Sequence, residues 1–129
     1  MLSLNRSIKL AAAGALYAPA SFKAASYNEL KRVCNGCGAA NAKFDFIPDR
    51  IYGTHIGSAC NIHDWMYEVG STIEDKDEAD RVMLNNLYRL IERDKHKWYK
   101  PTFLQRQRAL KYYFFVKHLG GSAFWSGKN

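Results

Sequence analysis

The sequence contains no run of apolar residues long enough to span a bilayer, so it predicts no transmembrane helix. It has only three cysteines in 129 residues, which excludes a small secreted scaffold held by many disulfides. Acidic residues are also in the minority, with 12 Asp and Glu against 19 Lys and Arg. The net charge of +7 favours anionic partners, either nucleic acid or an acidic membrane surface, although such a charge can also serve solubility alone.

The length and composition predict a single ordered domain, because 47% of the residues are hydrophobic and no internal repeat or low-complexity tract is present. The N-terminus has two interpretations. Arg6 and Lys9 precede an apolar, alanine-rich stretch at residues 10–20, an order that resembles a signal peptide. The same stretch is equally compatible with an alanine-rich first helix that ends near Pro19.

Hydrophobic periodicity predicts an all-α fold with four helical segments and no strand. The segments are expected within residues 3–33 with a break at Pro19, at residues 58–70, from a capping sequence at 71–74 to about 93, and at residues 102–119. Residues 34–57 are rich in Gly, Asn, Asp and Pro and are expected to form a long loop, which in a compact domain is usually functional.

Helix boundaries follow from capping residues. Ser58 is the expected N-cap of the second helix and Gly70 its expected C-cap. The third helix is expected to begin at a capping box in residues 71–74, or at Asp75 or Asp77. Its apolar stripe has helical spacing and consists of Met83, Leu84, Leu87, Leu90 and Ile91.

The most informative segment places His63 directly before Asp64 on the second predicted helix. His63 and Tyr67 share one helical face, whereas Asp64 points about 100° away. Asp80 falls on the apolar stripe of the third helix, and an unpaired buried carboxylate is costly. If the two helices pack antiparallel, Asp80 can face His63, fix its tautomer and accept a hydrogen bond from Tyr67.

Other histidines and tryptophans lack such a context. A lone histidine on a helix face is usually structural or exposed, so the surrounding carboxylates carry the argument for His63. The remaining histidines, His55, His96 and His118, are expected at the surface. The tryptophans, Trp65, Trp98 and Trp125, are expected in the core or at its rim.

The pattern Cys60-x-x-His63-Asp64-x-x-Tyr67, followed by Asp80, resembles the small calcium-dependent phospholipases A2 of the His-Asp type, especially their compact bacterial, fungal and viral branches. Residues 36–41 resemble the calcium loop of that family, which leads through Pro48 and Asp49 to the catalytic helix. The C-terminal pattern also resembles compact members: Arg108, Tyr112, Tyr113, Val116, Gly120 and Phe124. The resemblance covers roughly residues 34–124, so residues 34–129 are expected to form the catalytic domain after an N-terminal helical segment at 1–33.

The resemblance implies hydrolysis of the sn-2 ester of a glycerophospholipid. By analogy His63 would be the general base, Asp80 would orient and stabilise it, and Tyr67 would support Asp80. Asp64 would bind Ca²⁺ together with backbone carbonyls, namely those of Gly36, Gly38 and Ala40. The calcium ion would polarise the ester carbonyl.

The resemblance also implies partners and a cysteine pairing. The expected partner is an anionic phospholipid surface rather than nucleic acid, and the protein is expected to be a monomer. Its localisation stays open, with secretion or delivery to a membrane surface as one option. Cys37 and Cys60 would match the bridge that joins the calcium loop to the catalytic helix, with Cys34 left as a thiol.

Two alternatives stay open. Cys34-x-x-Cys37 followed by Cys60-x-x-His63 has the spacing of a Cys₃His zinc site in a small binding module for nucleic acid or protein. Zinc would use His63 and leave Asp64 and the buried carboxylate unexplained. The chain could also be a phospholipase-like protein that binds lipid without hydrolysing it.

Overall fold

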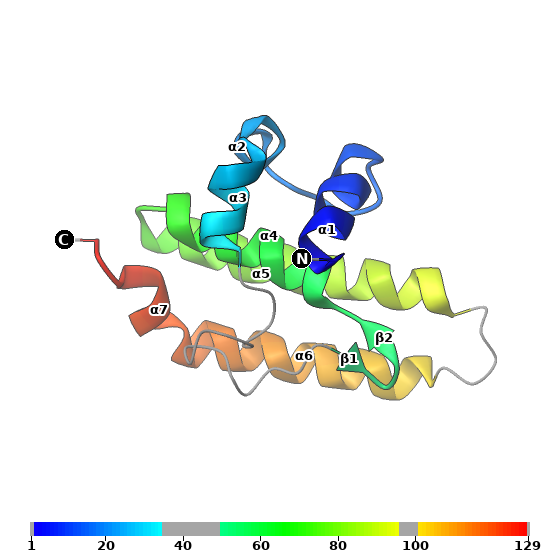
Figure 1. Cartoon of the computed structure of the whole chain (residues 1–129). Helices are drawn as coiled ribbons and strands as arrows, with labels where there is room; N and C mark the ends of the chain where they lie inside the picture. The colour runs from blue at the N-terminus through cyan, green and yellow to red at the C-terminus, as the bar shows by residue number, and fades with distance from the viewer. Residues whose placement is uncertain (1, 35–49, 96–100, 129) are drawn as a thin grey trace.

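The computed structural model describes residues 2–34, 50–95 and 101–128, and its backbone is mainly helical (Figure 1). The predicted all-α class is therefore confirmed. The helices are α1 (Leu2–Ala12), α2 (Ala20–Ala24), α3 (Tyr27–Val33), α4 (Gly57–Val69), α5 (Ile73–Asp94), α6 (Thr102–Leu119) and α7 (Gly121–Trp125). Two short strands, β1 (Arg50–Ile51) and β2 (Thr54–His55), precede α4.

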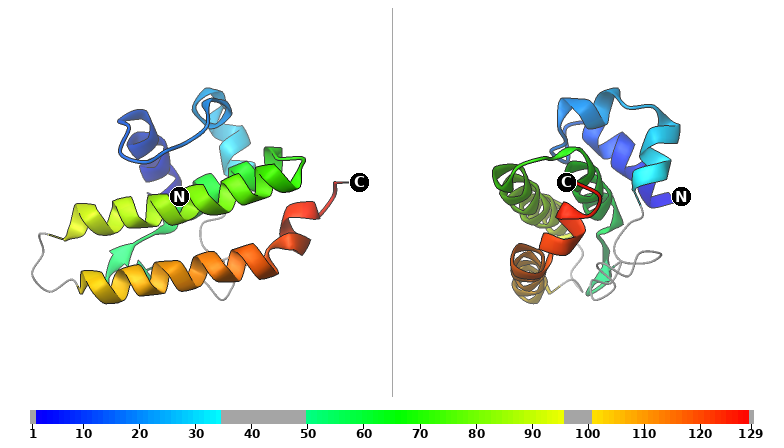
Figure 2. Two further views of the ribbon diagram at one scale, coloured as in Figure 1. Left: turned by 180° about the vertical axis from the view of Figure 1, so that it is seen from behind. Right: turned by 90° about the vertical axis from the view of Figure 1, so that its left-hand side faces the viewer.

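The helices form three layers around α4 and α5 (Figures 1 and 2). The α4–α5 pair lies in the middle, with α1 to α3 on one side and α6 on the other. Because only residues 70–72 separate α4 from α5, the two helices run antiparallel, which is the arrangement that lets Asp80 face His63. Residues buried on both sides of this pair make one continuous hydrophobic core.

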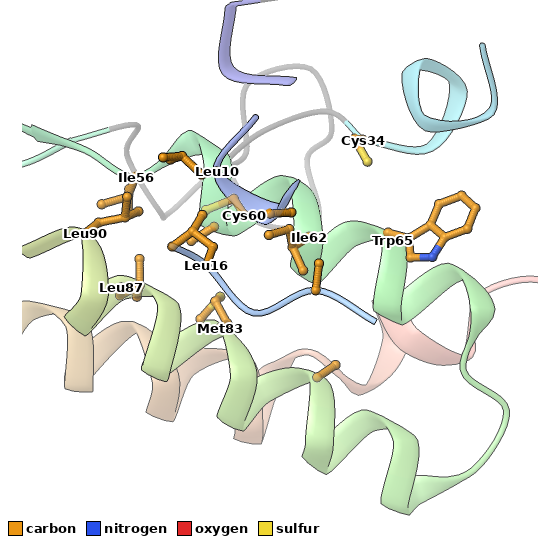
Figure 3. Packing of buried hydrophobic residues seen from close by; sticks show 14 of the residues in the cluster. Leu10, Leu16, Cys34, Ile56, Cys60, Ile62, Trp65, Met83, Leu87 and Leu90 are labelled. Atoms are coloured by element: carbon orange, nitrogen blue, oxygen red, sulfur yellow. The ribbon is translucent and has the colours of Figure 1, made fainter. Parts of the chain in front are cut away.

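The apolar stripe of α5 is buried as predicted, apart from Leu84, which is only partly covered. Met83, Leu87 and Leu90 pack towards Ile62 of α4 and Ile56 just before it (Figure 3). Complete burial of a side chain of this size contributes about 1.5–3 kcal/mol. The stripe therefore fixes the rotation of α5 about its axis, and Asp80 on the same stripe is carried into the core.

The turn between α4 and α5 differs in detail from the predicted capping. Gly70 is the C-cap of α4, as expected, but Ser58 lies inside that helix and Ile56 occupies its N-cap position. The capping box of α5 is formed by Thr72 and Asp75 rather than by residues 71 and 74. The predicted box was one residue too early, because Ser71 with Glu74 and Thr72 with Asp75 both place a hydroxyl three residues before an acid.

The prediction of no strand was wrong, because β1 and β2 pair as an antiparallel hairpin. Tyr52 and Gly53 at its tip both have positive φ, 45° and 87°, which matches the two-residue turns that suit hairpins. Gln105 of α6 holds the hairpin by donating from Nε2 to the Ile51 carbonyl at 3.0 Å and to the Thr54 hydroxyl at 2.8 Å. Two-residue strands carry too little alternation to be recognised by periodicity.

The N-terminal region consists of three helices rather than one broken helix. Gly14, with φ 77°, follows the end of α1, and Pro19 precedes α2, so Pro19 marks only one of the breaks. Leu4 and Leu10 of α1 are buried against α4, and a Cβ added to Gly57 of α4 would lie 3.0 Å from the Cβ of Ser3. The segment at residues 1–33 therefore contributes to the same core as the rest of the chain.

The C-terminal region begins with α6, whose predicted bounds of 102 and 119 are confirmed. The short helix α7 follows and was not predicted; its Phe124 is completely buried. Among the described residues, no helix has the length and apolar character needed to cross a membrane.

Candidate active site

A buried hydrogen-bond network joins α4 to α5 at the position the sequence predicted. His63 Nε2 lies 2.9 Å from Asp80 Oδ1, and the Tyr67 hydroxyl donates to the same oxygen at 2.7 Å. His63 and Asp80 are only 2% and 1% exposed, so solvent hardly screens this interaction. The i, i+4 spacing places His63 and Tyr67 on one face of α4, and their ring centroids are 4.1 Å apart.

Asp80 also binds a cation that the sequence reasoning missed. Lys76, one turn earlier on α5, donates from Nζ to Asp80 Oδ2 at 2.8 Å and is itself only 3% exposed. The available signal was the i, i+4 spacing of lysine and aspartate, but that spacing usually marks an exposed pair. Here α6 covers it, because Lys76 Nζ also donates to the carbonyls of Val116 and Lys117 at 3.0 and 3.2 Å.

The protonation state of Asp80 follows from these contacts. Burial by itself would raise the pKa of Asp80, but the hydrogen bonds from His63, Lys76 and Tyr67 and the charge of His63 outweigh it and lower that pKa. Asp80 is therefore an ionised carboxylate that can only accept hydrogen bonds. His63 must then carry its proton on Nε2, and in the neutral imidazole Nδ1 is the nitrogen that can take a proton.

Tyr67 is held in the protonated form that this role requires. Burial raises the pKa of Tyr67 far above its ordinary value, and the negative charge of Asp80 raises it further. The ring packs edge-on against Phe124 of α7 with centroids 5.2 Å apart. Gly120 allows this arrangement, because a Cβ there would lie 2.7 Å from the Tyr67 hydroxyl and 2.4 Å from the Val116 carbonyl oxygen.

Asp64, the residue after His63 on α4, is half-buried. Its position is indicated by Cys34 at the end of α3: burial and the negative charge of Asp64 together raise the pKa of the Cys34 thiol to about 12. Asp64 thus lies on the side of α4 that faces Cys34 at the end of α3. The expected carbonyl ligands Gly36, Gly38 and Ala40 lie outside the described residues.

Comparisons with protein-family models, curated proteins and solved structures found no match for this chain. Within the residues that the structure describes, no three His, Cys, Asp or Glu side chains are gathered into a metal site. An oxygen site for a hard cation would need Asp64 together with backbone carbonyls of residues that lie outside the described part of the chain.

The cysteines do not have the arrangement expected of a zinc site. Cys60 is disulfide-bonded, so it is not available as a thiolate. Cys34 is a buried free thiol that donates to the Asn61 carbonyl at 3.2 Å, and Cys37 lies outside the described residues. His63, the fourth expected zinc ligand, is bonded to Asp80. This geometry favours the interpretation in which His63 and Asp80 act together.

The remaining histidines and tryptophans lie where the sequence placed them, as far as they are described. His55 and His118 are exposed. Trp65 is buried against Phe22 and donates from its indole nitrogen to the Ser21 hydroxyl at 3.1 Å. Trp125 is 39% exposed at the rim, and residues 96 and 98 lie outside the described residues.

Proposed function

We propose that the protein is a calcium-dependent phospholipase A2 that hydrolyses the sn-2 ester of glycerophospholipids. The observation that supports this most is the buried network in which Asp80 accepts from both His63 and Tyr67 while Asp64 lies on the adjoining side of α4. A histidine oriented by a buried, ionised carboxylate is equipped to act as a general base. In the proposed reaction the attacking group is a water molecule that His63 activates.

The proposed reaction uses these groups as follows. Water gives a proton to His63 Nδ1 as its oxygen attacks the ester carbonyl, and the carbonyl bond electrons move to the oxygen of the tetrahedral intermediate. Asp80 stabilises the imidazolium that forms, and Tyr67 keeps the carboxylate in place. When the intermediate collapses, the bond to the glycerol oxygen breaks and the imidazolium returns the proton to that oxygen. Calcium bound by Asp64 and loop carbonyls would stabilise the negative charge on the carbonyl oxygen.

The proposed partner is an anionic phospholipid surface that binds the outer face of α6. This 18-residue helix contains no Asp or Glu. Its buried residues follow one stripe, and the residues on the opposite side include exposed apolar side chains, which are Phe103, Leu110 and Phe114. Lys111 and Lys117 flank that apolar row, so their ammonium groups could reach lipid phosphates while the rings enter the interface. The like charges argue against a second copy of the chain as the occupant.

Two substitutions on α4 separate the proposed roles. His63→Ala should abolish release of fatty acid while calcium binding, measured by calorimetry, is retained. Asp64→Asn should lose calcium binding and activity together. The matched control is His55→Ala, which removes an exposed histidine from β2 and should leave turnover unchanged. Vesicle binding by the wild-type protein without any fatty-acid release would instead favour a non-catalytic lipid-binding protein.

A further inference from the structure

Lys76 is the least expected charged residue in the described part of the chain. Its side chain is 3% exposed, and lysine is almost never buried without a partner. Its ammonium group has three N–H donors. It donates to three oxygens, which are Asp80 Oδ2, the Val116 carbonyl and the Lys117 carbonyl. Neither the general base nor the metal site of the proposed reaction uses this residue.

The two carbonyl contacts account for only part of this arrangement. The last carbonyls of a helix lack partners within the helix, and a cation near them is favourable. Lysines usually satisfy such carbonyls from the surface, where the ammonium group stays hydrated. Lys76 instead lies beneath α6 and binds the carboxylate whose other oxygen accepts from His63 and Tyr67. Its position therefore connects the end of α6 to the proposed catalytic network.

We infer that Lys76 is a positioning residue for the proposed hydrolysis, which binds Asp80 through Oδ2 and thereby keeps Oδ1 directed at His63. The inference rests on the proposed function. Lys76 supplies a full positive charge 2.8 Å from Asp80 Oδ2, and this charge does not depend on the protonation of His63. With that charge removed, Asp80 would lose the partner that favours its ionised form, and an uncharged Asp80 could not stabilise the imidazolium.

The test uses Lys76→Met, with Lys31→Met as the matched control because Lys31 is exposed on α3. Turnover is measured on a monomeric short-chain phospholipid, so that binding to a lipid surface does not contribute. Circular dichroism at the assay temperature gives the folded fraction, and kcat is expressed per folded molecule. Lys76→Met should lower kcat at least about tenfold with KM nearly unchanged, an effect of the size found when a supporting contact to a site residue is lost. The control should match the wild type.

A second comparison separates positioning from a purely structural role. In an Asp80→Asn background Lys76 has no carboxylate to orient, so Lys76→Met should cause no further loss of kcat. A structural role would give the same fold-loss in both backgrounds, or unfolding with normal kcat per folded molecule, and either result would overturn the inference. If Lys76→Met does not fold, Lys76→Gln keeps a donor without the charge and should show the same loss of kcat.

The outcomes for the inference and for the proposed function are distinct. A folded wild-type protein that releases no fatty acid with calcium would refute the proposed function itself. A wild-type protein that is active, together with a Lys76→Met variant of equal kcat, would refute only the role of Lys76.

Discussion

Replacing Asp80 by asparagine should destabilise the fold as well as lower turnover. The substitution keeps the size of the side chain but removes the charge that faces Lys76, and both residues are almost completely buried. Removing one partner of a buried ion pair costs about 3–5 kcal/mol, because the remaining charge stays desolvated. Lys76 keeps its two carbonyl acceptors, so we expect a loss near the lower end, about 3 kcal/mol.

Such a loss is large for a single domain, because total stabilities are about 5–15 kcal/mol. Urea unfolding followed by circular dichroism is a suitable assay. With a slope of about 1–3 kcal/mol per molar urea, the midpoint should fall by about 1 M or more. The double variant Asp80→Asn with Lys76→Met removes both charges and should recover part of the loss. If Asp80→Asn shifts the free energy of unfolding by less than about 1 kcal/mol, or if the double variant is less stable than Asp80→Asn, the argument from the buried pair fails.

Three further predictions concern the close packing at Gly120, the charge of Asp80 and the outer face of α6. Gly120→Ala should lower the free energy of unfolding by about 1–3 kcal/mol, since its Cβ would overlap the Val116 carbonyl and the Tyr67 hydroxyl. Gly121→Ala is the control, because the space around Gly121 is open. Equal urea midpoints for the two variants would contradict the close packing at Gly120. The pKa of Asp80 is lowered by folding, so its contribution is present above its unfolded pKa of about 4 and is lost as the pH falls through the folded value. The stability gap between wild type and Asp80→Asn should therefore shrink between pH 7 and pH 3, and a constant gap in urea titrations would argue against an ionised Asp80. Phe114→Asp on the outer face of α6 should weaken sedimentation with anionic vesicles, and salt should weaken wild-type binding. Tyr27→Asp, which changes an exposed tyrosine of α3, is the control. If Tyr27→Asp weakened vesicle binding as much as Phe114→Asp, or if the wild type bound zwitterionic and anionic vesicles equally, α6 would not be the membrane-binding face.

The contact between His63 and Asp80 could be predicted because it depends on regular features. The 3.6-residue period placed Tyr67 beside His63, the apolar stripe carried Asp80 into the core, and the short turn after Gly70 made α4 and α5 antiparallel. The burial of Lys76 and the need for Gly120 could not be predicted in this way. Both depend on how α6 and α7 dock against α4 and α5, and no local pattern specifies that docking.

The hairpin and the N-cap of α4 were missed for a different reason. A tyrosine with positive φ at position 52 is uncommon, so the turn at Tyr52 and Gly53 has no familiar sequence signal. Serine is a favoured N-cap residue, but Ser58 lies inside α4. Its carbonyl accepts a hydrogen bond from the Ser7 hydroxyl of α1. In both cases contacts with distant residues decided the local conformation.

The most direct test of the proposed function is the release of fatty acid by the wild-type protein from phospholipid that carries a distinguishable acyl chain at each position. Anionic vesicles are incubated with the folded protein in the presence of calcium, and in parallel with excess chelator. The account predicts release of the sn-2 chain with calcium, and loss of that release when calcium is chelated. Release from the sn-1 position, release that persists after thorough chelation, or no release at all would contradict it.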